Sequence, residues 1–323
     1  MVLYNPVVDV EMLQERSWRV ISGLFATVTH GRLRNPCISK RSFKISGFME
    51  YKSKRLRLEA EELEKLPIKK KAYGQHFLRN QAVVDRMIHS VNISPETSVA
   101  EIGCGDGFLT SAILHQTKCK NLFVYEIDSE WIDYVEKKIR DSRLKINNDD
   151  ILQVDLEKDL SSHKPIVLLA NLPYQITFPI LFKIQKCKNL FQEGVVMVQE
   201  EVAQKIVAAR GKKFSPTTMF LQRHFEWKLL DKVAPGSFIP APKVFSRTLY
   251  FKPIFNVPEI PRETEFWAFL KLCYRFPRQT LKNNLKATKY FTNQKLSPEF
   301  LALRAQQLPF NDFVSLWKEI ISE

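Results

Sequence analysis

The chain has 323 residues, a length that predicts two domains or one large domain with an extension. Hydrophobic residues make up 45% and charged residues 26%, which excludes disordered, collagen-like and disulfide-stapled classes. The 49 Lys and Arg exceed the 35 Asp and Glu, and the resulting net charge of +14 favours a polyanionic partner. The five cysteines show no CxxC spacing, so we expect no metal site and a reducing compartment. No run of about 18 uncharged apolar residues is present, so we expect no membrane association.

Residues 1–68 differ in composition from the rest of the chain. From Arg16 to Met49 there are seven Lys or Arg and no acidic residue. This pattern is typical of an organellar transit peptide, but it also fits a disordered basic arm or a start at Met49. The segment Leu56–Leu66 then predicts a short amphipathic helix that ends before Pro67.

From Lys69 onward, apolar runs alternate with helical patterns. Helices are predicted over Ala82–Val91, from about Phe108, and over Trp131–Ile139. Strands are predicted at Ser98–Ile102, Leu122–Ile127, Ile166–Ala170 and Gly194–Val198. This alternation predicts an α/β fold in which a parallel sheet carries helices on both faces. A Pro-rich segment and a wholly helical pattern follow, so we expect a boundary near Lys252 between domains at 69–252 and 253–323.

A glycine cluster and two acids occupy successive ends of these strands. Gly103, Gly105 and Gly107 follow the first strand with G-x-G-x-G spacing, which differs from the G-x-G-x-x-G of dinucleotide sites. Glu126 ends the next apolar run, where an acid can accept hydrogen bonds from ribose hydroxyls. Asp150 follows the expected third strand and could hold an adenine amino group. Each feature alone also fits a tight turn, a helix cap or a solvated loop, but together they predict an adenosine-bearing cofactor.

The tetrapeptide Asn171-Leu172-Pro173-Tyr174 follows the strand Ile166–Ala170. The Asn171 side-chain oxygen and the Leu172 carbonyl can both accept hydrogen bonds from an exocyclic amine. Pro173 offers no competing donor, and Tyr174 offers a flat surface for a flipped base. The alternative is a strand that ends in a proline-containing turn.

The tetrapeptide and the glycine cluster together resemble the amino-methyltransferases that use S-adenosylmethionine, and more narrowly the rRNA adenine N6-dimethyltransferase family. Further stretches carry this resemblance over about residues 69–315: Tyr73–Leu78, Gln175–Ile180, Gln199–Lys205, Phe238–Ser246 and Arg304–Leu308. The resemblance implies a Rossmann-like methyltransferase sheet followed by a smaller all-helical C-terminal domain.

The resemblance also implies a cofactor, a substrate and roles for single residues. The activity would be transfer of methyl groups from S-adenosylmethionine to N6 of two adjacent adenines, in a hairpin near the 3′ end of small-subunit rRNA. The cofactor would contact residues of the first stretch, of the glycine turn and of the strand ends: Gln75, His76, Leu78, Gly103, Gly105, Glu126, Asp150 and Asn171. The target base would lie between Tyr174 and Phe238, with Asn171, Leu172 and Pro173 beside the reacting amine.

Basic residues in three places suggest an RNA surface. One set, at spacings typical of a single helix face and without any acid from Lys271 to Pro298, comprises Lys271, Arg275, Arg278, Lys282, Lys286 and Lys289. Pro277 lies within this set and could interrupt the helix. A second cluster comprises Lys205, Arg210, Lys212, Lys213 and Arg223, and a third comprises Lys69, Lys70 and Lys71. We expect all three to contact backbone phosphates, so that structured RNA is selected by shape and by a splayed loop base. The segment Pro277–Leu281 departs from the family, whose bacterial members usually carry three basic residues there.

The expected partner is small-subunit rRNA within an immature ribosomal subunit, bound by a monomer in the cytoplasm. A transit peptide at residues 1–48 would instead place the protein in mitochondria or another organelle. Two other functions remain open from the sequence. One is a large-subunit rRNA methylase of the macrolide-resistance type, and the other is a non-catalytic relative such as a mitochondrial transcription cofactor.

Overall fold

A computed structural model describes residues 67, 70, 74–291 and 296–322. Residues 1–66 are not among them. The basic arm and the helix expected at Leu56–Leu66 therefore lie outside the described residues.

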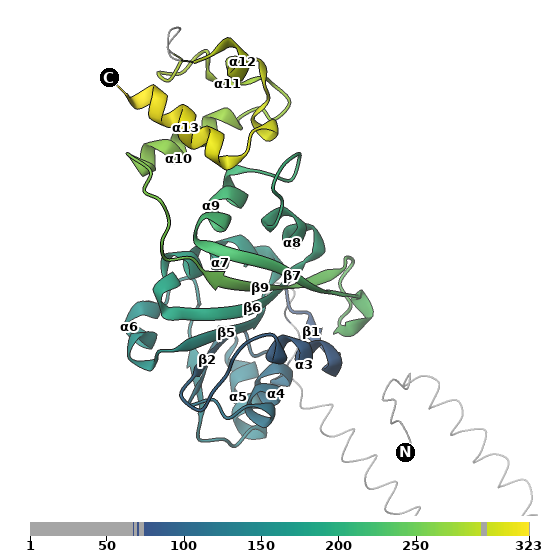
Figure 1. The fold of residues 1–323 in the computed structure, drawn as a ribbon. Helices are drawn as coiled ribbons and strands as arrows, with labels where there is room; N and C mark the ends of the chain where they lie inside the picture. The colour runs from purple at the N-terminus through teal and green to yellow at the C-terminus, as the bar shows by residue number, and fades with distance from the viewer. Residues whose placement is uncertain (1–66, 68–69, 71–73, 292–295, 323) are drawn as a thin grey trace, which may run out of the picture. The chain divides into compact units, whose positions relative to one another are not determined.

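Seven strands form one mixed sheet in the order β4-β3-β2-β5-β6-β9-β7 (Figure 1). Its strands are β2 (Ser98–Ile102), β3 (Leu122–Glu126), β4 (Leu144–Asn148), β5 (Ile166–Asn171), β6 (Phe191–Gln199), β7 (Phe225–Val233) and β9 (Ser246–Pro253). The strands from β4 to β6 run parallel, whereas β9 is antiparallel to both β6 and β7. The expected parallel sheet is confirmed for the strands predicted from the sequence, and β7 and β9, which were not predicted, add an antiparallel edge.

A separate two-stranded ladder joins distant parts of the chain. Strand β1 (Phe77–Leu78) pairs with β8 (Phe238–Ile239), and Leu78 lies opposite Phe238. The backbone N–H of Arg79 also donates to the Ser237 carbonyl at 2.7 Å. These contacts join two of the stretches that carry the family resemblance, the one that ends at Leu78 and the one that begins at Phe238.

The helices begin where polar side chains satisfy free backbone donors. Asn80, Asp128, Ser215, Thr280 and Ser297 each accept from a backbone N–H in the first turn of the helix that follows. The helices are α3 (Gln81–His89), α4 (Phe108–Gln116), α5 (Ser129–Lys138), α6 (Leu156–Leu160), α7 (Thr177–Lys186), α8 (Glu200–Ile206), α9 (Pro216–His224), α10 (Glu263–Cys273), α11 (Leu281–Leu285), α12 (Pro298–Ala302) and α13 (Phe310–Ile321). Within the described part of the chain, no helix combines the length and apolar character that crossing a bilayer requires.

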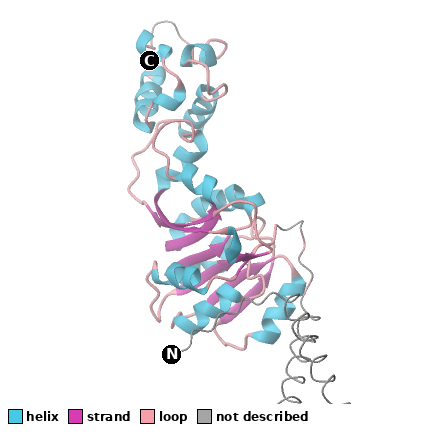
Figure 2. Ribbon diagram, turned by 90° about the vertical axis from the view of Figure 1, so that its right-hand side faces the viewer, coloured by secondary structure: helices cyan, strands magenta, loops and turns pink. Residues whose placement is uncertain are grey.

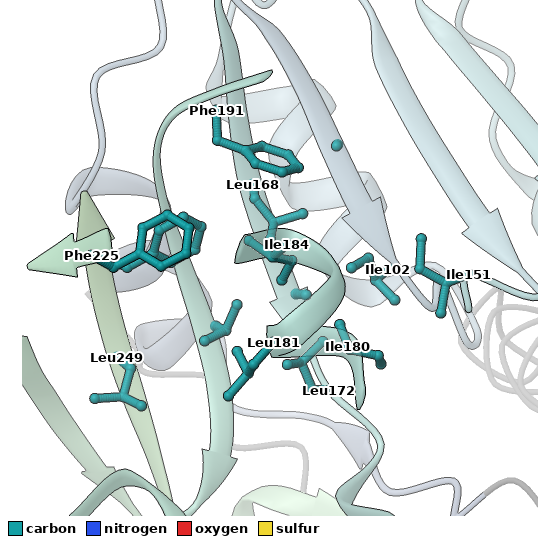
Figure 3. Packing of buried hydrophobic residues seen from close by; sticks show 14 of the residues in the cluster. Ile102, Ile151, Leu168, Leu172, Ile180, Leu181, Ile184, Phe191, Phe225 and Leu249 are labelled. Carbon is teal, nitrogen blue, oxygen red and sulfur yellow. The ribbon is translucent and has the colours of Figure 1, made fainter. Parts of the chain in front are cut away.

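Helices cover both faces of the sheet, as Figure 2 shows. Strand β5 is buried on both faces, since Leu168 belongs to one hydrophobic cluster and Val167 and Leu169 to another. The first cluster includes residues of α7 such as Ile180 and Ile184 (Figure 3). The second cluster contains the apolar faces of α3 and α4. The continuous apolar character of β5 therefore reflects a central strand between two helical layers.

The C-terminal helices have a core of their own. Phe266, Phe269 and Trp317 are fully buried in a third cluster, which also includes Met219 of α9. The Trp317 indole N–H donates to the Pro261 carbonyl at 2.6 Å. The helical C-terminal portion is thus confirmed. The boundary expected near Lys252 falls within the last residues of β9, and it stays a prediction.

The strand order reverses beside β2, which has β3 on one side and β5 on the other. At such a switch point, the connections from neighbouring strands leave the sheet toward opposite faces, and a crevice opens at the carboxyl ends of the strands. The residues predicted for the cofactor and the reaction follow these same strand ends.

Candidate active site

A cavity of about 270 Å³ lies at the carboxyl ends of β2, β3 and β5. Its lining brings together most of the residues that the sequence singled out, from the first stretch, the glycine turn, the strand ends and the tetrapeptide: Gln75, His76, Leu78, Gly103, Gly105, Glu126, Asp150, Asn171, Leu172, Pro173 and Tyr174. Phe238 is not among the lining residues.

The turn between β2 and α4 requires glycine at several positions. Gly103, Gly105 and Gly107 have φ of 77°, 51° and 81°, in the left-handed region that side chains disfavour. A Cβ on Gly105 would also lie 2.8 Å from the ring of Phe77. The backbone of this turn can therefore approach a ligand and the β1 segment closely, which larger residues would prevent.

The Glu126 carboxylate is held beneath the glycine turn. It is 7% exposed and accepts from the backbone N–H groups of Gly105 at 3.2 Å and Asp128 at 3.0 Å. Burial raises the pKa of Glu126, and these two backbone donors act against that rise by stabilising the carboxylate. An oriented carboxylate at the end of β3 is suited to accept hydrogen bonds from vicinal hydroxyls.

Glu101, in β2, lines the same cavity and was not assigned a role from the sequence. Its Oε2 accepts from the Thr110 hydroxyl at 2.8 Å, whereas its buried Oε1 has no partner among the described residues. Burial raises the pKa of Glu101 to about 8. The signal that could have identified it is an acid within an otherwise apolar strand, directly before the glycine turn.

The cavity is acidic although the chain as a whole is basic. Among the described residues, its lining contains no lysine or arginine, but it contains five acids: Glu101, Asp106, Glu126, Asp149 and Asp150. Two of them do not add negative charge, because Asp106 forms an ion pair with Arg79 and the raised pKa of Glu101 keeps it protonated at neutral pH. Such a lining disfavours a pyrophosphate and favours a ligand with positive charge. S-adenosylmethionine fits this lining, because its sulfonium and ammonium groups are cationic and the unpaired Oε1 of Glu101 needs a donor.

The side chain of Asn171 is oriented by a backbone acceptor. Its Nδ2 donates to the His76 carbonyl at 3.0 Å, and a carbonyl can only accept, so Oδ1 takes the opposite position. The Leu172 N–H donates to the Met197 carbonyl at 3.0 Å, which continues the pairing between β5 and β6. Asn171 therefore presents its side-chain amide to the cavity from the rigid end of the central strand β5.

Tyr174 also lines the cavity, and its ring packs against that of a histidine. Its hydroxyl is 2.6 Å from Ser246 Oγ, and its ring stacks on His76 with centroids 5.5 Å apart and planes at 28°. His76 Nδ1 in turn donates to the Pro240 carbonyl at 2.8 Å. Burial raises the pKa of Tyr174, so its phenol stays neutral across the physiological range.

The expectation that Phe238 faces Tyr174 is not met in this structure. Phe238 is 2% exposed and belongs to the hydrophobic cluster that contains Leu78, its partner in the β1–β8 ladder. This ladder pairs two short strands, and the buried side chain of each contributes to the core beneath α3. The ring that lies beside Tyr174 is that of His76.

The basic residues from Lys271 to Lys289 do not lie on one helix. Helix α10 ends at Cys273, and α11 begins only after Thr280, whose side chain accepts from the Asn283 N–H at 3.4 Å. Pro277 in the connection has no N–H to donate and so does not continue α10. The expectation that Pro277 could interrupt this helix face is met, since a second helix begins after it. All six basic residues are exposed: Lys271, Arg275, Arg278, Lys282, Lys286 and Lys289.

The second basic cluster contains exposed residues and residues that form ion pairs within the protein. Arg210, Lys212 and Lys213 are exposed. Lys205 is half-buried and forms an ion pair with Glu201 at 2.9 Å. The Arg223 side chain is only 6% exposed and pairs with Glu263 at 3.1 Å, so it joins α9 to α10 and is not available to a phosphate.

In the third cluster, Lys69 and Lys71 lie outside the described residues. Lys70 is held by two carboxylates beside the cavity, Asp128 at 2.8 Å and Glu130 at 3.1 Å. We therefore assign Lys70 to positioning the segment before β1, since Asp128 also accepts from the Gln75 amide at 3.3 Å.

The sheet order, the glycine turn and the acidic cavity define a Rossmann-like methyltransferase. A family model described as ribosomal RNA adenine dimethylase matches residues 68–321, and the chain belongs to this family. The members of this family are enzymes that use S-adenosylmethionine. The expected family, enzyme class and cofactor are therefore confirmed.

Relatives and solved structures agree with this assignment. The chain is 39% identical over 220 residues to ribosomal RNA small subunit methyltransferase A of Mesomycoplasma hyopneumoniae strain J, covering 68% of this chain and 82% of that protein. It is 34% identical over 254 residues to the protein of the same name in Francisella tularensis subsp. tularensis, covering 76% and 95%. The crystal structure of a dimethyladenosine transferase from Plasmodium falciparum is 26% identical with a TM-score of 0.62, covering 75% of this chain and 96% of that one. A 23S rRNA methyltransferase, 20% identical with a TM-score of 0.60 over 76% of this chain and 100% of its own, shares the fold. These findings support the small-subunit enzyme over the large-subunit methylase and the non-catalytic cofactor.

Proposed function

We propose that this chain dimethylates N6 of two adjacent adenines in a hairpin near the 3′ end of small-subunit rRNA, within an immature ribosomal subunit. The observation that carries the proposal is the juxtaposition of an acidic, glycine-rimmed cavity with the Asn171–Tyr174 corner at the carboxyl edge of one sheet. The names of the relatives, which are small-subunit methyltransferases, support the choice of substrate.

The proposed cofactor placement follows the charges and donors of the cavity. S-adenosylmethionine supplies an electrophilic methyl group on a sulfonium. Glu126 would accept from the ribose hydroxyls, and Asp150 would accept from the adenine amino group. The methionine end would lie along the Gly103–Gly105 turn, where the unpaired Oε1 of Glu101 would accept from the ammonium. Gln75, His76 and Leu78 would close the opposite side, on the segment that carries β1.

The proposed chemistry depends on holding a weak nucleophile. The lone pair of an adenine amine is delocalised into the ring, so the amine must be oriented and made more pyramidal before it can attack. Asn171 Oδ1 and the Leu172 carbonyl would accept hydrogen bonds from the two N–H groups of the amine. As N6 bonds to the methyl carbon, the bond from that carbon to sulfur would break, S-adenosylhomocysteine would leave, and the surplus N6 proton would pass to water. Because His76 already fixes the Asn171 amide, the acceptor does not need to reorganise in the transition state.

Stacking on Tyr174 would hold the flipped base in line with the methyl group. The ring is fixed by its hydroxyl contact with Ser246, which limits the entropy lost when the base binds. His76 now lies 5.5 Å from Tyr174, a spacing that leaves no room for a base between the two rings. Phe238 would contribute to the base site only if its ring left the core.

Phosphate contacts would come from the half-buried Lys205 of α8, from exposed basic residues of the α8–α9 connection, and from exposed basic residues of α10, α11 and the connections that follow these two helices. These are Lys205, Lys212, Lys213, Lys271, Arg275, Arg278, Lys282 and Lys286. Action as a monomer and a cytoplasmic location, without membrane association, belong to the same proposal.

Mass spectrometry of small-subunit rRNA from cells with and without the gene tests the function directly. We expect two N6,N6-dimethyladenines per subunit to disappear with the gene and to return with the wild-type chain. Unchanged rRNA modification would refute the proposal, and loss of modification from large-subunit rRNA would support the alternative methylase.

A further inference from the structure

Three exposed apolar side chains lie close together in the chain, beside the tetrapeptide Asn171–Tyr174. Ile239, Val244 and Phe245 are 51%, 44% and 45% exposed; Ile239 ends β8, and the other two lie in the connection from β8 to β9. We call these three residues the apolar strip. Single exposed apolar residues are common, but three within seven positions need a reason.

Backbone and side-chain contacts hold the strip in place next to Tyr174. The Pro240 carbonyl accepts from His76 Nδ1 at 2.8 Å, and the Phe245 carbonyl accepts from the Glu200 N–H at 2.9 Å. Ser246, the next residue, contacts the Tyr174 hydroxyl at 2.6 Å. The connection lies at the ends of β7 and β9, where β8 joins β1 (Figure 1). The strip is thus anchored on both sides while its side chains face solvent.

The charges around the strip are positive. Lys232 Nζ lies 4.4 Å from the centroid of the Phe245 ring, and Lys243 is exposed on the same connection. The neighbouring acids are already neutralised, since Asp231 pairs with Arg86 at 2.7 Å and Glu200 pairs with Arg247 at 2.7 Å. An aromatic ring with cations beside it is the combination that binds a base and its phosphate, and Lys232 would exchange its contact with the ring for the phosphate.

We propose that the apolar strip binds an unpaired rRNA nucleotide that flanks the target adenine. The base stacks on Phe245 and contacts Val244, and its phosphate pairs with Lys232. This inference rests on the proposed function, because it takes the nucleotide at Tyr174 to be the methylated one. A second stacked base next to the flipped one would fix the register of the loop, and so select which adenine enters the site.

The test uses the full chain and an RNA hairpin with two adjacent loop adenines, in which 2-aminopurine replaces the nucleotide beside them. Phe245→Ala should weaken hairpin binding by about 5- to 100-fold and reduce quenching of the 2-aminopurine, while leaving the salt dependence of binding unchanged. Lys232→Ala should lower the slope of log affinity against log salt by about one. Both variants should bind S-adenosylmethionine as the wild type does, because neither residue lines the cavity.

Phe255→Ala is the matched control. Phe255 is 62% exposed and lies just beyond the other end of β9, whose eight residues span roughly 25 Å at the rise of an extended strand. We expect this variant to match the wild type in hairpin affinity, in 2-aminopurine quenching, in the salt dependence of binding and in cofactor binding. If Phe245→Ala also matches the wild type, the inference is wrong, even though the wild type methylates rRNA. If the loss appears only with intact subunits and not with the hairpin, the strip contacts a ribosomal protein and the RNA assignment is overturned. A wild type that methylates no rRNA would instead refute the proposed function.

Discussion

Replacement of Asn171 by alanine tests the reaction corner most directly. The variant loses one half-buried hydrogen bond, from Nδ2 to the His76 carbonyl at 3.0 Å, which costs about 0.5–1.5 kcal/mol of stability. For a unit of this size, that loss lowers Tm by only a few degrees. The same change removes the oriented acceptor for the adenine amine, so the rate of methyl transfer should fall about 100-fold or more, equivalent to roughly 2.7 kcal/mol. The effect on the transition state should therefore exceed the effect on the fold.

The assay is single-turnover methylation of immature small subunits at saturating S-adenosylmethionine, with cofactor affinity measured separately by calorimetry. Asn148→Ala is a suitable control, because Asn148 also ends a strand and donates to the carbonyls of Glu126 at 3.2 Å and Ile127 at 3.3 Å. Asn148 does not line the cavity, so its variant should transfer methyl groups at close to the wild-type rate. A wild-type rate for Asn171→Ala would mean that the tetrapeptide is only a turn, and the proposed mechanism would be wrong.

Three further predictions concern the cofactor, pH and RNA. Glu126→Ala should weaken binding of S-adenosylmethionine by about 1.5–3 kcal/mol in calorimetry, and an unaltered affinity would remove Glu126 from the ribose site. Burial raises the pKa of Glu101 from 4.5 to about 8. Between these two pH values the folded chain keeps a proton that the unfolded chain releases, so the free energy of unfolding falls as the pH rises from about 4.5 to about 8. Glu101→Gln should therefore make the Tm of the cofactor-free protein less dependent on pH between about 4.5 and 8, and an identical pH profile would contradict the burial argument. Alanine at both Lys282 and Lys286 should lower the salt dependence of rRNA binding by about 1 to 2 units of slope, and an unchanged slope would mean that neither contacts phosphate.

The parts of the site that follow strand ends could be predicted from the sequence. Gly103, Glu126 and Asn171 each follow or end an apolar run, and parallel strands bring their carboxyl ends to one edge of the sheet. Local spacing was sufficient here because the topology of a doubly wound sheet is narrowly constrained. For Glu101 the sequence shows only an acid within an apolar strand, whereas its burial and its unpaired Oε1 are properties of the tertiary structure.

The surroundings of Tyr174 depend on contacts between distant segments. His76 and Pro240 are 164 positions apart, yet their hydrogen bond holds the histidine ring that stacks on Tyr174. The pairing of β1 with β8 buries Phe238, and short strands of two residues are too brief to show a period. Which ring meets the base is thus decided by packing rather than by motif.

The basic residues show the same division between local and tertiary information. Their number and the acid-free stretch after Lys271 are properties of the sequence, and they indicate a polyanionic partner without any structure. Whether a given cation is free depends on its neighbours in space, since Arg223 pairs with Glu263 while Lys212 remains exposed. Strand-end motifs thus suffice to predict an adenosine-bearing cofactor, and the resemblance carried by the longer stretches indicates the family and the class of reaction, because both depend on residues that are adjacent in the chain. Which side chains meet the RNA and the target base is set only when long-range pairing and burial determine what each residue contacts.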